Sequence, residues 1–100
     1  GRMSKMTQLD LSHNRILGAE GAGAMAGALG RMPQMTWLNL SASNLGPEGA
    51  GAVAGALERM GRTTWLSLSR NRLGADGAAA LAGALGRMGK MTELDLSYND

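Results

Sequence analysis

The side chains that could support catalysis in this 100-residue sequence lie near its start. His13, the single histidine, follows Asp10 by three positions, and serines are frequent around both. A serine–histidine–acid triad needs these residue types, but it also needs a pocket and donors for the oxyanion. The flat, solvent-exposed strand surface inferred below offers no pocket. We therefore expect no enzymatic activity.

Metal binding is the second chemistry to consider. The sequence has no cysteine, so it cannot form a thiolate site, and one histidine cannot form a multi-histidine centre. The carboxylates of Asp10 and Asp95 are predicted to lie three strands apart, roughly 14 Å at ordinary strand spacing. Glu93 and Asp95 share a strand face without further oxygen ligands nearby. We expect neither a metal nor a cofactor.

Composition limits the remaining classes of partner. Apolar residues make up 44% and charged residues 18%, which is typical of a globular domain. The net charge is +2, and acidic residues are interleaved with the arginines through the whole sequence, so we expect no basic stripe and no nucleic-acid binding. Apolar stretches are shorter than the roughly 20 residues that span a bilayer, so we expect no membrane segment. Without a visible signal peptide, a cytoplasmic location is expected.

An internal repeat organises the chain. A short block beginning Met6-Thr-Gln-Leu9-Asp-Leu11-Ser recurs three times, at offsets of 29, 28 and 28 residues. We interpret residues 1–100 as one array, with repeats at about 6–34, 35–62 and 63–90 and a partial repeat at 91–100.

Each repeat combines two hydrophobic periods. Leu9 and Leu11 alternate with polar residues, which predicts a short strand with one buried face. Val53 and Leu57 are spaced i, i+4, which predicts a helical stripe. Small residues inside the helices are expected to let neighbouring helices approach closely; the glycines concerned are Gly23, Gly27, Gly51, Gly55 and Gly83.

The pattern L-x-L-S-x-N-x-L-G-x-E/D-G-A resembles the leucine-rich repeat. Its 28/29-residue form is similar to the ribonuclease-inhibitor-like class, which includes arrays of NOD-like receptors and of Ran GTPase-activating proteins. The resemblance implies an α/β solenoid, a right-handed β-α superhelix, here with four parallel strands and three helices. It also implies that Asn14, Asn71 and Asn99 bond the backbone of the turn after each strand. Ser43 takes this position in the second repeat, where weaker bonding is expected.

Polar and aromatic residues flanking the leucines are predicted to form a concave face. Strand spacing near 4.8 Å brings Trp37 and Trp65 side by side. Adjacent tryptophans suit an interaction hot spot, although they could equally pack on each other with no partner. The predicted partner-binding residues are Trp37, Trp65, Arg70, Tyr98, His13, Asp10, Asn39, Asp95 and Glu93.

The predicted function is therefore a protein–protein interaction module that binds through its concave strand face, within a longer array. The alternative is a self-assembling repeat module. Gly1–Asn14 nearly duplicates Gly86–Asn99, so both ends are cut at the same phase of the repeat and are expected to be uncapped. A third function, regulation of a small GTPase, follows from fold similarity with one branch of the family. The sequence does not identify the partner.

Overall fold

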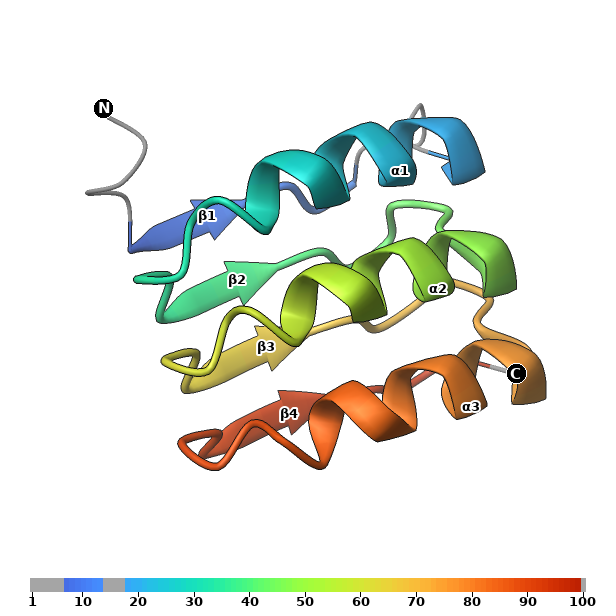
Figure 1. The fold of residues 1–100 in the computed structure, drawn as a ribbon. Coiled ribbons are helices and arrows are strands. Elements are labelled where there is room, and N and C mark those ends of the chain that lie inside the picture. The colour runs from blue at the N-terminus through green and yellow to red at the C-terminus, as the bar shows by residue number, and fades with distance from the viewer. Residues whose placement is uncertain (1–6, 14–17, 100) are drawn as a thin grey trace.

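Four strands and three helices alternate along the chain, as the repeats predict (Figure 1). The computed structural model describes residues 7–13 and 18–99. The strands and helices are β1 (Gln8–Asp10), α1 (Gly18–Leu29), β2 (Trp37–Asn39), α2 (Gly46–Leu57), β3 (Trp65–Ser67), α3 (Gly74–Leu85) and β4 (Glu93–Asp95). Among these elements, no helix is long and apolar enough to cross a membrane.

The strands form one parallel sheet in the order β1-β2-β3-β4, and the helices form a second layer over one of its faces (Figure 1). The sheet register follows the sequence repeat: Leu38 lies opposite Leu66, and Leu66 lies opposite Leu94. A shift of one residue would turn every leucine to the other face. The periodic leucines therefore set both the register and the buried face.

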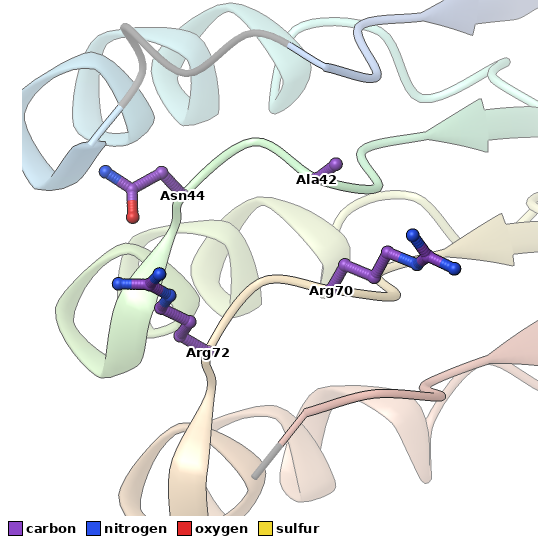
Figure 2. Close-up of a pocket in the computed structure, with 4 residues that line it drawn as sticks. All are labelled: Ala42, Asn44, Arg70 and Arg72. Carbon is purple, nitrogen blue, oxygen red and sulfur yellow. The ribbon is translucent and has the colours of Figure 1, made fainter.

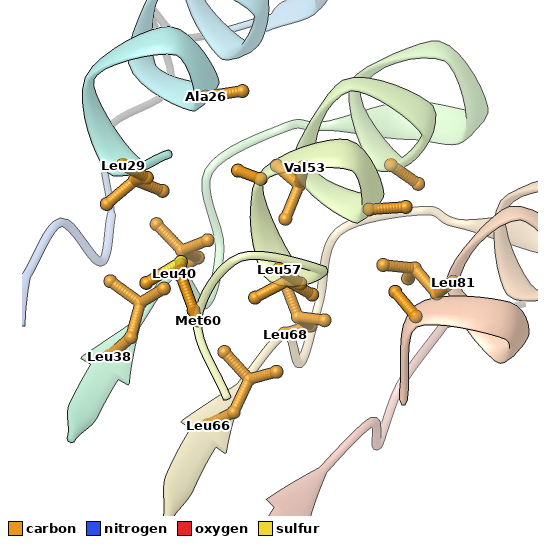
Figure 3. Close-up of a cluster of buried hydrophobic side chains, with 14 of the residues drawn as sticks. Ala26, Leu29, Leu38, Leu40, Val53, Leu57, Met60, Leu66, Leu68 and Leu81 are labelled. Atoms are coloured by element: carbon orange, nitrogen blue, oxygen red, sulfur yellow. The ribbon is translucent and has the colours of Figure 1, made fainter. Parts of the chain in front are cut away.

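Leucines from the strands and the helices meet between the two layers (Figure 3). The side chains of Leu38 and Leu66 are fully buried, as are those of Val53 and Leu57 on α2. Met60 closes the core from the loop after α2. Flexible methionine side chains fill irregular space well. The core is therefore continuous across the repeats.

The close contacts between helices involve other glycines than the sequence analysis selected. A Cβ on Gly23, Gly27, Gly51, Gly55 or Gly83 would meet no atom within 4 Å, so that expectation is wrong. Gly49 and Gly77 are the tight positions: a Cβ on Gly77 would lie 3.0 Å from the Cβ of Leu73 and 3.3 Å from the Cα of Pro47. Glycine is thus needed where the first turn of one helix faces the preceding helix.

Asn71 holds together the turns that follow the strands. Its side chain is fully buried, and its amide donates to the carbonyl of Leu40 at 2.7 Å. Its Oδ1 accepts the backbone N–H groups of Ser43 at 2.8 Å and Leu45 at 3.3 Å. The predicted role of this asparagine is thereby confirmed, and Asn99 repeats it toward the turn of Asn71.

The turns of the first and second repeats carry Asn14 and Ser43 at the position of Asn71. The hydroxyl of Ser43 donates to the carbonyls of Leu11 at 3.0 Å and Ser41 at 3.3 Å; that it caps more weakly than an asparagine stays a prediction. The equivalent first-repeat residue, Asn14, lies outside the described residues.

Candidate functional site

The indoles of Trp37 and Trp65 form a stacked pair on the sheet face opposite the helices. Each residue begins its strand, and the two lie opposite each other in the register. Their ring centroids are 4.4 Å apart and the ring planes differ by 8°. Both side chains are partly buried. The predicted juxtaposition is confirmed, and the stack places two partly buried indoles side by side on this face.

A carboxylate fixes one end of this stack. Trp65 donates its Nε1–H to Oε2 of Glu93 at 3.1 Å, and Glu93 lies opposite Trp65 in the register of β3 and β4. Gln8 occupies the same position at the β1 end, opposite Trp37. The row therefore runs from a carboxamide through two indoles to a carboxylate.

The residues that end the strands, such as Asn39 and Asp95, form hydrogen bonds within the turns that follow. Asp95 Oδ1 accepts the hydroxyl of Ser97 at 2.6 Å and its backbone N–H at 3.0 Å. Asn39 makes the same two bonds with Ser41, at 2.8 Å and 3.0 Å. An Asp or Asn two residues before such an N–H forms an Asx turn. The sequence analysis missed this role, although the Asp/Asn-x-Ser spacing indicates it.

These bonds change the acidity of the two exposed aspartates. Hydrogen bonds from the Ser97 side chain and backbone lower the pKa of Asp95, and the nearby charge of Arg70 contributes in the same direction. Ser12 lowers the pKa of Asp10 in the same way. Hydrogen bonds that favour the ionised carboxylate lower its pKa. Both groups are therefore charged at neutral pH.

The residue three positions after the end of each strand has a left-handed backbone conformation. His13, Ala42, Arg70 and Tyr98 have φ values of 62°, 53°, 57° and 58°. The guanidinium carbon of Arg70 lies 4.9 Å from the centroid of the Tyr98 ring, a cation–π contact. His13 is exposed. Arg70 and Tyr98 are thus brought together, while His13 lies three strands away from Tyr98 in the sheet order.

An open cavity of about 370 Å³ lies between two successive turns (Figure 2). Its lining residues are Ala42, Asn44, Arg70 and Arg72. Arg72 extends toward Asn44, whereas Arg70 extends toward the strands. The cavity thus lies between the turn that leads into α2 and the turn that leads into α3.

Metal ligands do not converge in the part of the chain that the structure describes. No group of three or more histidine, aspartate or glutamate side chains is placed to hold an ion there. Asp10 and Asp95 lie on the outermost strands, β1 and β4.

The described charges are distributed unevenly over the fold. Glu20, Glu48 and Asp76 lie in the first turns of the helices, and Asp10, Glu93 and Asp95 lie in the strands. Of the seven described Lys and Arg residues, five lie in the loops that lead from each helix to the next strand, together with Glu58. Charges that alternate along the sequence are thus partly separated in the fold.

Comparisons with known proteins agree with this architecture. The family described as "Leucine Rich repeat" matches residues 2–26 and 64–82. A solved structure of the tropomodulin C-terminal domain from Caenorhabditis elegans is similar to this chain with a TM-score of 0.52. The likeness covers 97% of this chain and 77% of that one at 8% sequence identity, so it concerns the fold alone. A comparison with curated protein sequences gave no match.

Proposed function

Because this chain is a leucine-rich repeat protein, we propose that its concave strand face binds a protein partner, with the stacked indoles of Trp37 and Trp65 at the centre of the contact. Leucine-rich repeat domains are generally protein-binding modules, and solenoids typically present an extended concave surface to their partners. The indole stack is the observation that carries the proposal.

Preorganisation supports this role for the stack. Tryptophan is enriched at the energetic centres of interfaces because it covers a large area with few rotatable bonds. Here each indole limits the movement of the other, and the hydrogen bond to Glu93 fixes the Trp65 ring. Binding therefore orders fewer side-chain rotamers of this face, which lowers the entropic cost of association. Arg70 over Tyr98 adds a second anchor on the same side of the sheet.

Selection from a displayed random-peptide library tests the proposal without knowledge of the natural partner. We expect selected peptides to bind the unmodified chain and to lose at least about tenfold in affinity toward a W37A/W65A variant. A matched control, E48A/D76A, changes two exposed residues in the helix first turns. It should retain binding. Peptides that bind all three proteins equally would contradict the proposal.

Self-assembly is a second candidate function, favoured by one observation on β4. Leu94 and Leu96 are 41% and 39% exposed, whereas the equivalent Leu66 and Leu68 are fully buried. With α3, Leu96 lines an apolar cavity of about 240 Å³. A second copy that adds a repeat unit to β4 and α3 would cover this surface.

Light scattering coupled to size exclusion separates the two functions. Self-assembly predicts a dimer or larger species that an L94R/L96R variant converts to a smaller one. Partner recognition predicts that W37A/W65A loses peptide binding while the molecular mass stays the same. A monomer at all concentrations would contradict self-assembly and leave the concave-face proposal standing.

A further inference from the structure

The loops that lead from each helix to the next strand form a second charged surface, separate from the concave face. We define this loop edge as residues 30–36, 58–64 and 86–92. In Figure 1 the three loops lie beside one another at the end of the sheet where the strands begin.

Contacts between successive loops confirm that they adjoin. Arg87 forms an ion pair with Glu58 of the preceding loop, with 3.8 Å between Nη1 and Oε1. The Cδ of Arg59 lies 3.7 Å from the Cβ position of Gly30 in the loop before it. At the base of the loops, the Thr92 hydroxyl donates to the carbonyl of Thr64 at 3.0 Å. The loops are therefore stacked in register, and their exposed side chains project along a common edge.

Charge is concentrated at this edge. It carries five exposed cations and one carboxylate, whereas the rest of the described chain carries six carboxylates and two arginines. The cations are Arg31, Arg59, Arg62, Arg87 and Lys90. Glu58 is the one acid of the loop edge; it pairs with Arg87, and five cations less this one carboxylate leave the edge a net charge of +4.

We propose that the loop edge binds an extended acidic segment of a protein, with carboxylates lying along Arg31, the Arg59–Arg62 pair and the Arg87–Lys90 pair. Alternate side chains of an extended peptide are about 6.6–6.8 Å apart. Each loop joins a helix to a strand. Neighbouring helices lie about 8–10 Å apart and neighbouring strands about 4.8 Å apart, so the spacing between successive loops lies between these values, close to the peptide repeat. One carboxylate can therefore meet each repeat.

The residue types favour an acidic peptide over a nucleic acid. Single-stranded nucleic acids bind to grooves in which bases stack on aromatic side chains. The loop edge contains no aromatic residue. Trp37 and Trp65 begin the strands that follow two of these loops, but their rings are stacked on each other, so neither indole offers both faces to a base.

Compensation of the helix dipoles does not account for this number of cations. Each helix C-terminus carries about half a negative charge. The cations lie at least two residues past the ends of α1, α2 and α3, and two loops carry a pair of them. A purely structural role predicts that their removal lowers stability and leaves peptide binding unaffected, so the two roles can be separated by experiment.

Fluorescence anisotropy with a labelled peptide of alternating glutamate and serine tests the proposal on the intact chain. We expect R59Q/R62Q to weaken binding at least about threefold, and E58Q to strengthen it. The matched control, R72Q, removes one positive charge at the opposite end of the strands and should change binding less than R59Q alone. Added salt should weaken binding, because exposed charges are screened.

Three results would overturn the proposal. These are no binding of the peptide to the unmodified chain, an equal loss in R59Q and R72Q, and tighter binding of single-stranded oligothymidylate than of the peptide. Thermal unfolding of each variant checks that it remains folded; if R59Q/R62Q does not fold, R59Q alone replaces it. None of these results depends on the concave face.

Discussion

Asn71 in the turn after β3 accepts the backbone N–H of Ser43 in the turn after β2, with 2.8 Å between Oδ1 and the nitrogen. The same side chain donates to the carbonyl of Leu40 in the second repeat and of Leu68 in its own. One buried carboxamide therefore satisfies backbone groups of two repeats at once. This link between repeats supports the sheet whose outer face carries the stacked indoles.

Replacing Asn71 with alanine should be strongly destabilising. The change leaves the buried N–H of Ser43 and the carbonyl of Leu40 without their partner, and we expect a loss of about 3 kcal/mol in the free energy of unfolding. Urea denaturation followed by circular dichroism measures it. Asn99→Ala is the matched control: Asn99 is only partly buried, so water can replace its bonds and the loss should be smaller. Equal losses would contradict the explanation.

Two helix glycines should respond oppositely to alanine. At Gly51 a Cβ meets nothing within 4 Å, so Gly51→Ala should stabilise the chain by about 0.5–1 kcal/mol through helix propensity. At Gly77 a Cβ would crowd Leu73 and the backbone of Pro47, so Gly77→Ala should destabilise it by roughly 1–2 kcal/mol. Thermal unfolding compares them. The packing described for α2 and α3 is wrong if both variants shift in the same direction.

The left-handed turn residues offer a route to stabilisation. Ala42 has a φ of 53°, a conformation that costs an L-residue about 1–2 kcal/mol. Ala42→Gly should remove this strain and, after the entropy of the unfolded glycine is counted, stabilise the chain by about 0.5–1 kcal/mol. Ala52→Gly, inside α2, should destabilise it by a similar amount. Melting temperatures that fall in both variants would refute the assignment of strain to Ala42.

The acidity of Asp95 gives a pH-dependent prediction. Its pKa is lowered in the folded chain, chiefly by the Ser97 hydroxyl. The ionised group therefore contributes stability above its unfolded pKa, and this contribution is lost as pH falls through the folded pKa. Carbon-detected NMR titration of the Asp95 carboxyl should show the lowered pKa, and Ser97→Ala should raise it toward the ordinary value. An unchanged pKa in this variant would show that the hydroxyl is not the cause.

Asp95→Asn provides the companion test. Asn39 already forms the same turn with a neutral carboxamide. The variant should therefore keep its fold at neutral pH while losing the part of the acid sensitivity that Asp95 contributes.

Much of the fold could be predicted because leucines recur at a fixed interval. The spacing of Leu38 and Leu66 sets the register, and the register in turn brings Trp37 beside Trp65. The spacing does not distinguish Gly49 from Gly51, because only the packing of successive helices decides which glycine faces a neighbour.

Other features emerge only in three dimensions. Arg70 and Tyr98 adopt left-handed backbone although neither residue type favours it, since the repeated turn imposes that conformation. The charged loop edge likewise arises from stacking, because Arg59 and Arg87 are 28 residues apart in sequence yet lie in adjoining loops.

Nitrogen–proton NMR of the two indole Nε1–H groups tests the concave-face proposal most directly, because Trp37 and Trp65 are the only tryptophans and give one signal each. On titration with a peptide selected for binding to the chain, both signals should shift and saturate together, with the midpoint that anisotropy gives for the same peptide. Peptides that bind at that concentration while both indole signals stay in place would contradict the account.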